Sequence, residues 1–205
     1  MSALSGARVV LGVSGGIAAY KAVEVCRRLV DAGAHVVPVL TEGALRFVGR
    51  TTFDALGSER AWTSLWDEDR PIPHTHLGQR ADLVVVAPAT ARVLGLYRAG
   101  ISEDLLQNVL IATRAPVIVC PAMHTEMWEH PAVQENLAVL RERGVHVVEP
   151  GVGRLAGGDV GAGRLAEPAD IVAAAEAVLA RATAVQDLAG LRVLVTAGGT
   201  REPID

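Results

Sequence analysis

Short apolar runs rich in β-branched residues alternate along this chain with segments of helical spacing, and this alternation restricts the fold more than any other feature. Runs that are apolar throughout are typical of strands buried on both faces of a parallel sheet. Five such runs are predicted strands: residues 8–13, 35–40, 81–87, 117–120 and 145–148. Helical spacing is clearest over residues 17–32 and 169–182. The sequence therefore predicts an α/β fold, a three-layer, doubly wound, Rossmann-like parallel sheet.

Composition excludes several classes of protein. The chain has 205 residues and a net charge of −4, a balance that disfavours a nucleic-acid partner. No apolar run approaches the roughly 18 residues of a membrane span. The amino-terminal residues, MSALSGARVVLGVSGG, read as a strand and a turn and not as a signal peptide. We therefore expect a cytoplasmic protein without a membrane partner. Cys26 falls in a helical pattern and Cys120 in a strand, so both are expected in the core.

A glycine-rich turn joins the first predicted strand to the first predicted helix. Residues 12–21, GVSGGIAAYK, place small residues and one hydroxyl where free backbone N–H groups and the helix dipole favour an anion. The spacing matches neither GxGxxG nor GxxxxGK[ST], so it indicates a phosphate without naming the nucleotide. A tight turn that serves only packing is the alternative. Thr41 and the turn at residues 87–90 stand at the carboxyl ends of the next two strands, on the same edge of the sheet.

Two later segments could complete a site at this edge. Residues 121–128 are predicted to form a loop in which Met123, His124 and Met127 could cover a flat heteroaromatic ring, although the methionines could equally fill the core. Residues 149–168 contain six glycines and no apolar periodicity, and we predict a long mobile loop there. It could close as a lid over an anionic substrate or be a solvated loop. Its charged residues are Arg154, Asp159, Arg164 and Glu167.

A histidine pair precedes the third predicted strand. His74 and His76 are predicted to lie in a loop, residues 71–78. An i, i+2 pair could bind a metal ion, but no third ligand stands at a telling spacing, so we predict no metal site. One histidine acting as an acid or a base is more economical, and either one taken singly could be a loop residue without a role.

These segments resemble the signatures of the flavin-containing cysteine decarboxylases. PAMHTEMW at residues 121–128 resembles their PxMNxxMW motif, and residues 153–168 resemble their substrate clamp, which ends GxGRMxEP. The glycine turn, APAT at residues 87–90 and a histidine eight residues before Asp82 extend the resemblance from residue 8 to about residue 180. Residues 193–205 are similar to the opening of a phosphopantothenate–cysteine ligase. We therefore expect a decarboxylase domain at 1–182, then a linker and a truncated ligase start at 183–205.

The resemblance implies a cofactor, a reaction and an assembly. FMN would take up the electrons, and 4′-phosphopantothenoylcysteine would become 4′-phosphopantetheine through oxidation of the thiol side, loss of CO2 and re-reduction. His74 would be the catalytic residue, and the chain would form trimers, or multiples of trimers, with flavin sites between subunits. The implied FMN contacts are Ser14, Gly15, Gly16, Ile17, Thr41, Ala87, Pro88, Thr90, Asp104, Leu105 and Met123. The implied substrate contacts are His124, Met127, Arg154, Asp159, Arg164 and Glu167.

Two residues depart from the family pattern. His124 replaces the usual asparagine, which makes a hydrogen bond to the substrate depend on protonation. Gly157 replaces the clamp cysteine, which is the acid for the final enethiol reduction in the family. The chain would need another donor or water, or would release the enethiol. Two alternatives follow: an oxidative peptide cysteine decarboxylase, and a flavin-binding regulatory module without full turnover. The ligase-like end favours coenzyme A biosynthesis.

Overall fold

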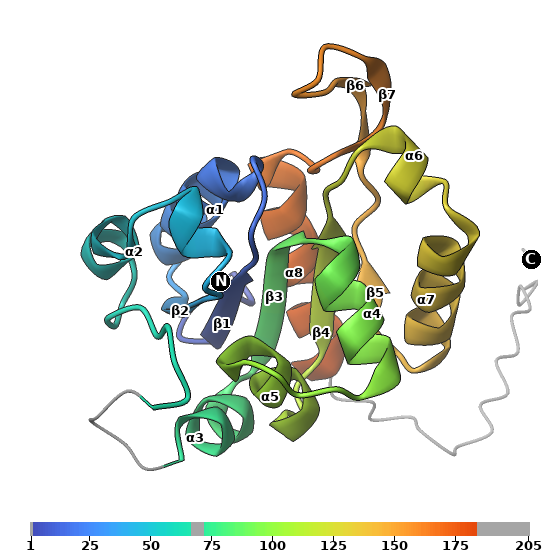
Figure 1. The fold of residues 1–205 in the computed structure, drawn as a ribbon. Coiled ribbons are helices and arrows are strands. Elements are labelled where there is room, and N and C mark those ends of the chain that lie inside the picture. The colour runs from blue at the N-terminus through green and yellow to red at the C-terminus, as the bar shows by residue number, and fades with distance from the viewer. Residues whose placement is uncertain (1, 67–71, 184–205) are drawn as a thin grey trace, which may run out of the picture.

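A five-stranded parallel sheet forms the centre of the protein. The computed structural model describes residues 2–66 and 72–183, and the strands pair in the order β2-β1-β3-β4-β5. Helices cover both faces of the sheet (Figure 1), so the predicted three-layer α/β fold is confirmed. The strands are β1 (Arg8–Val13), β2 (His35–Leu40), β3 (Leu83–Ala89), β4 (Val117–Pro121) and β5 (His146–Val147).

Two groups of helices make the outer layers. One face of the sheet carries α1 (Ala19–Asp31) and α8 (Pro168–Thr183), which also pack on each other. The second face carries α3, α4, α5 and α7, in which α3 packs on α5 and α4 on α7. Their bounds are α3 (Pro73–Arg80), α4 (Ala91–Ala99), α5 (Leu105–Ala112) and α7 (Pro131–Glu142). The short elements are η1 (Ala44–Arg46), α2 (Arg50–Leu56), which packs on α1, and α6 (Thr125–Trp128).

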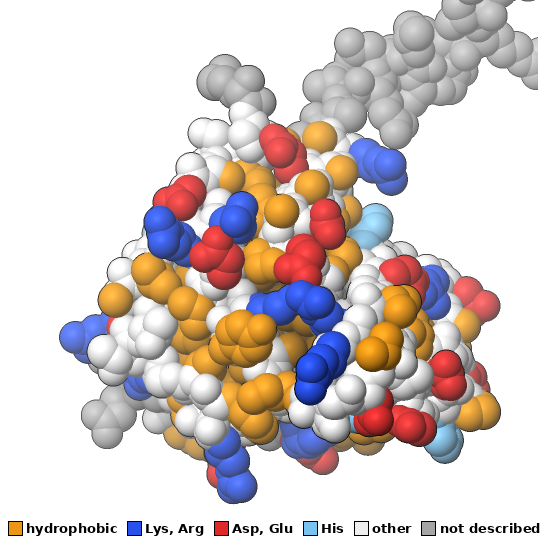
Figure 2. Space-filling model, turned by 90° about the horizontal axis from the view of Figure 1, so that it is seen from above, with side chains coloured by type: hydrophobic (Ala, Val, Ile, Leu, Met, Phe, Trp, Pro, Cys, Tyr) orange, Lys and Arg blue, Asp and Glu red, His pale blue; other side chains and the backbone are white. Residues whose placement is uncertain are grey.

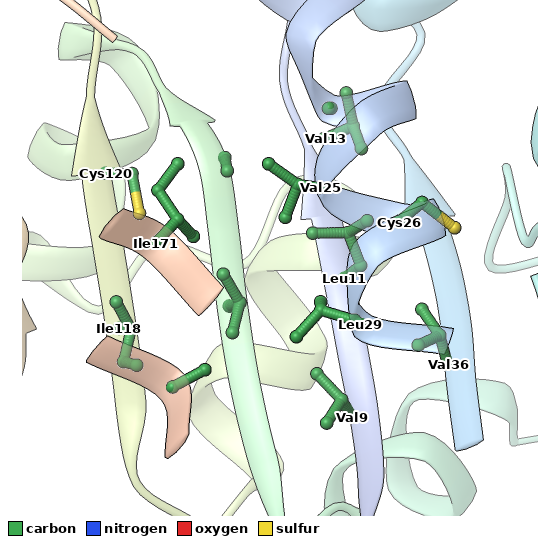
Figure 3. Packing of buried hydrophobic residues seen from close by; sticks show 14 of the residues in the cluster. Val9, Leu11, Val13, Val25, Cys26, Leu29, Val36, Ile118, Cys120 and Ile171 are labelled. Atoms are coloured by element: carbon green, nitrogen blue, oxygen red, sulfur yellow. The ribbon is translucent and has the colours of Figure 1, made fainter. Parts of the chain in front are cut away.

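The strands divide their side chains between two hydrophobic clusters because successive residues of a strand point to opposite faces. Val9 and Leu11 of β1 lie in the cluster beneath α1 and α8, whereas Val10 lies in the cluster on the other face. Figure 3 shows Ile118 and Cys120 of β4 pointing together toward Ile171 of α8. Both faces of the sheet are therefore covered by apolar side chains and shielded from water, which explains why these strands are apolar throughout.

The strand order creates a crevice at one edge. β1 pairs with β2 on one side and with β3 on the other, so the connections from this strand position leave in opposite directions. In doubly wound sheets, ligands bind outside the carboxyl ends of the strands at such a switch point. That edge lies at the top of Figure 1.

The predicted long mobile loop at residues 149–168 is wrong. Residues Gly151–Arg154 and Val160–Arg164 form an antiparallel hairpin, β6 and β7, which projects above the sheet edge (Figure 1). Val152 and Val160 are 76% and 75% exposed, so neither strand has the buried apolar face that would produce a periodic pattern. The hairpin is instead held by main-chain contacts that sequence periodicity cannot reveal.

Two further predicted loops contain helices. His74 and His76 lie in α3 and not in a loop, because Pro73 stands in the first turn of the helix, where its fixed φ and missing N–H are accommodated. The helix has Leu77 as its one large buried side chain, too little to give a helical pattern. The last four residues of the 121–128 segment form the single turn α6.

The two cysteines lie in the hydrophobic core. Cys26 and Cys120 are fully buried, as predicted, and burial raises the pKa of Cys26 to about 11 and that of Cys120 still further. Among the helices of the described residues, none is long and apolar enough to cross a membrane. The predicted linker and ligase start, residues 183–205, lies outside the described residues except for Thr183 at the end of α8.

We predict that Ile118→Ala lowers the free energy of unfolding by about 2–5 kcal/mol, because it opens a cavity in the middle of the sheet. Ile111→Ala is the matched control, since Ile111 is 48% exposed on α5 and should change stability by no more than about 0.5 kcal/mol. Urea unfolding followed by circular dichroism measures both. Equal losses in the two variants would contradict the described core.

Candidate functional site

A cavity of about 560 Å³ opens at the carboxyl edge of the sheet. It lies between the start of α1, the end of β3, the 122–127 segment and the hairpin. Seen from above this edge, hydrophobic side chains gather around the middle of the face and Lys and Arg side chains lie beside them (Figure 2). The predicted site residues that line the cavity are Gly15, Gly16, Ile17, Pro88, Thr90, Met123, His124, Met127, Arg154 and Arg164.

The glycine turn forms the side of the cavity next to α1. Gly15 touches the main chain of the turn after β2 so closely that a Cβ atom would lie 2.6 Å from the carbonyl carbon of Gly43. Only glycine fits there. The N-cap of α1 is Ala18, which cannot cap with its side chain, and the first turn contains no acidic residue. The positive end of the helix dipole therefore faces the cavity without a neutralising side chain.

Ser14 lies beneath the cavity instead of lining it. Its side chain is buried, its hydroxyl donates to the Pro88 carbonyl over 2.7 Å, and it accepts from the Thr90 N–H over 3.2 Å. These bonds tie the end of β1 to the end of β3. Thr90 then accepts from the Val93 N–H as the N-cap of α4 and presents its remaining surface to the cavity. Ser14 thus positions the floor of the site.

Besides Ser14, four other predicted cofactor residues do not line the cavity. Thr41 is buried and accepts a hydrogen bond from the Ala44 N–H over 3.2 Å, and Ala87 and Leu105 are buried in the core. Asp104 caps α5 by accepting from the Gln107 N–H. In the structure these four residues cap a helix, bond to the main chain or fill the core. Their contact with a cofactor stays a prediction.

His74 also stays away from the cavity of its own chain. It belongs to α3, which packs on α5 and lies at the bottom of Figure 1, whereas the hairpin and α6 lie at the top. Its Nδ1 atom is buried and has no hydrogen-bond partner within the described residues. Within those residues, no group of three or more His, Cys, Asp or Glu is placed to hold a metal ion.

A small charged cluster stands at the mouth of the cavity. His124 hydrogen-bonds Glu126 through Nδ1, and its Nε2 lies 3.2 Å from Oδ2 of Asp159 in the turn of the hairpin. The hydrogen bond with Glu126 holds the pKa of His124 above its usual range, and the negative charges of Glu126 and Asp159 act in the same direction. The same hydrogen bond holds the pKa of Glu126 below its usual range. Asp159 does not line the cavity itself and contacts it through the His124 side chain.

Lys21 is a cavity residue that the sequence analysis missed. Its side chain is 11% exposed, and its ammonium pairs with Glu167 over 3.2 Å, while Arg164 pairs with the same carboxylate over 2.8 Å. Tyr20 lines the cavity as well. Tyr20 and Lys21 lie in the first turn of α1, three and four residues after the predicted contact Ile17. Residues at this spacing share one face where the chain is helical, and the spacing is the signal that could have revealed Tyr20 and Lys21.

Comparison with known proteins settles the family. Residues 2–180 match the family described as Flavoprotein. The chain is a member of the flavoprotein family. This result confirms the resemblance seen in the sequence. The coenzyme A biosynthesis bifunctional protein CoaBC of Mycobacterium tuberculosis is 55% identical over 199 residues, which cover 97% of this chain and 48% of that protein. This flavoprotein chain therefore spans about half the length of the curated relatives it matches.

Solved structures of other flavoproteins have the same fold. A cysteine-to-serine variant of PPC decarboxylase complexed with pantothenoylaminoethenethiol superposes with a TM-score of 0.75 at 31% identity, covering 83% of this chain and 96% of that one. The FMN-dependent cysteine decarboxylase SpaF gives a TM-score of 0.74 at 29% identity, covering 88% of this chain and 99% of that one.

The glycine turn provides a test of the cavity wall. We predict that Gly15→Ala lowers the free energy of unfolding by about 1–3 kcal/mol, because the methyl group collides with the backbone of Gly43. Gly16→Ala is the control, since its nearest contact would be the Thr90 methyl group at 3.8 Å, and it should unfold like the unmodified chain. Thermal unfolding without added flavin measures both, and an unchanged Gly15→Ala midpoint would contradict the described contact.

Proposed function

We propose that this chain is an FMN-dependent decarboxylase that converts 4′-phosphopantothenoylcysteine to 4′-phosphopantetheine and CO2 in coenzyme A biosynthesis. The observation that carries the proposal is the cavity, where the glycine turn, the PAMHTEMW segment and the hairpin meet. These are the segments through which the sequence resembles the cysteine decarboxylases. The 55% identity to a coenzyme A biosynthesis protein and the likeness to PPC decarboxylase support it.

FMN fits the site by shape and by charge. The sheet order β2-β1-β3-β4-β5 is the order in which an FMN binds at the β1/β3 switch point of doubly wound folds. The turn at Gly15 and Gly16 and the start of α1 would hold the phosphate. Ile17 and Met123 offer apolar surface to the ring system. Bound there, the flavin would supply the two-electron oxidation and reduction that the reaction needs.

Side chains from the hairpin would hold the anionic substrate. Arg154 and Arg164 reach the cavity from β6 and β7, and guanidinium groups suit phosphate and carboxylate groups. Glu167 lies between Arg164 and Lys21, so it fixes the positions of both cations. Met127, which is 48% exposed, offers an apolar surface to the uncharged part of the substrate.

The position of His74 requires a second copy of the chain if this histidine is catalytic. Because α3 and the cavity lie at opposite edges of the sheet, we propose that a neighbouring subunit of a trimer, or of a multiple of trimers, supplies His74. Large exposed apolar side chains beside the glycine turn would be covered in such an assembly. They are Ile17, Tyr20, Leu45 and Phe47.

An oxidative peptide cysteine decarboxylase is the second candidate. The likeness to SpaF and the absence of a side chain at Gly157 favour it, because an enzyme that stops at the enethiol needs no final acid. A flavin-binding module without turnover is the third. The three differ in their products, so product analysis separates them.

The deciding experiment incubates the flavin-loaded protein with 4′-phosphopantothenoylcysteine and follows CO2, product mass and flavin absorbance together. We expect CO2, 4′-phosphopantetheine and a flavin that returns to its oxidised form. Enethiol two mass units lighter, with the flavin left reduced, would support the peptide decarboxylase class. A protein that binds flavin and releases no CO2 would contradict the proposed enzyme.

His74→Asn should abolish CO2 release while flavin stays bound, because the variant removes the acid–base group and leaves the cavity intact. Co-expression with Gly16→Leu should restore activity, since this second variant blocks only the flavin cavity and a mixed oligomer can combine one intact His74 with one intact cavity. His76→Asn is the control and should keep its activity. A monomeric flavin-bound form by light scattering, or full CO2 release by His74→Asn, would contradict the shared site.

A further inference from the structure

His124 lines the cavity next to Gly157, the position at which the family has its acid. We propose that His124 donates the proton that completes the reaction, in place of the clamp cysteine that this chain lacks at Gly157. The inference rests on the proposed function and assigns the last proton transfer to a named atom, Nε2 of His124.

The geometry around Gly157 supports this assignment. A Cβ atom at this position would lie 3.2 Å from Nε2 of His124 and 3.3 Å from Oδ2 of Asp159. A cysteine side chain and the imidazole would therefore compete for the same space. The φ angle of Gly157 is not in the left-handed region, so the backbone does not require glycine here. What the missing side chain provides is room for His124.

No cysteine of the chain can act in place of His124. The chain has two cysteines, and both are fully buried in the core outside the cavity. Cys120 lies in β4 beneath α8, and Cys26 lies in α1. His124, by contrast, lines the cavity with 38% of its side chain exposed, so it can meet a bound substrate.

The charged groups around the imidazole also support the assignment. Glu126 on α6 and Asp159 in the hairpin turn contact its two nitrogens and stabilise the protonated ring. Arg154 and Arg164 line the same cavity and oppose this charge, but Arg164 is itself paired with Glu167. The carboxylates prevail and raise the pKa of His124. Asp159 is 69% exposed and can turn to solvent, which frees the Nε2–H for a substrate.

The proposed step is a proton transfer to carbon. After CO2 leaves, the substrate is an enethiolate. The Nε2–H bond breaks, the electron pair of the C=C bond forms a C–H bond at the carbon that carried the carboxylate, and a sulfur electron pair forms C=S. Neutral imidazole remains. FMN held at the glycine turn by Gly15 and Gly16 would supply the hydride that reduces the thioaldehyde to the thiolate of the saturated product.

His124→Asn tests the assignment, because asparagine is the family residue and keeps a hydrogen-bonding group without an acidic proton. We expect CO2 release to continue, the enethiol to accumulate with reduced flavin, and the saturated product to form about a hundredfold more slowly or worse. His130→Asn is the control, since His130 lies outside the cavity and its N-cap role on α7 is one that asparagine can take.

Restoring the family pair should restore the product. In His124→Asn/Gly157→Cys the shorter asparagine leaves space for the thiol, so we expect saturated product and oxidised flavin again. Gly157→Cys alone would crowd His124 and should not exceed the unmodified chain. Failure of the double variant to regain any saturated product would count against a proton donor at this position.

Two further readouts separate this inference from the proposed function. The pKa of His124 measured by NMR should lie above about 6.5, and formation of saturated product should fall as the pH rises through that pKa. A His124 pKa well below 6.5 would overturn the inference, because neutral imidazole has no proton to give. Equal yields of saturated product from His124→Asn and the unmodified chain would overturn the inference alone. Absence of CO2 from the unmodified chain would overturn the function as well.

Discussion

The pairing of β1 with β3 is the constraint on which the site depends. Because β1 also pairs with β2, the sheet has a switch point at this place, and a crevice opens outside the carboxyl ends of both strands. Ser14 closes the bottom of this crevice by bonding to Pro88 and Thr90. The turn above it places Gly15 and the start of α1 on the wall of the cavity. A single buried hydroxyl thus connects the packing of the core to the chemistry of the edge.

The second constraint joins the hairpin to the segment after β4. The Met123 N–H donates to the Gly163 carbonyl over 3.0 Å, and the Thr125 hydroxyl donates to the Ala162 carbonyl over 2.8 Å. Gly163 adopts a φ of 126°, and a Cβ atom there would lie 2.1 Å from the Met123 carbonyl oxygen. The hairpin can therefore rest on this segment only with glycine at this position. Its placement brings Asp159 to His124 and both arginines to the cavity.

The sequence predicted the parts of this molecule that periodicity controls. Strands buried on both faces must be apolar throughout, so β1 and β2 could be recognised at the bounds they have, whereas the strand predicted at residues 81–87 runs from Leu83 to Ala89. The hairpin could not be recognised, because Val152 and Val160 point to solvent and its anchors are hydrogen bonds from Met123 and Thr125 to its own carbonyl groups. The contact between His124 and Asp159 was also beyond prediction, since it joins two segments whose relative position depends on the whole fold. The position of His74 at the opposite edge of the sheet could not be predicted for the same reason.

A crystal structure of the FMN complex would show where the flavin binds. We expect one flavin at each β1/β3 switch point, with its phosphate within hydrogen-bond distance of the N–H groups at Gly15 and Gly16. We also expect the ring system against Met123 and a His74 side chain from another subunit nearby. A flavin bound away from the glycine turn, or a complete site formed within one chain, would contradict the proposed site.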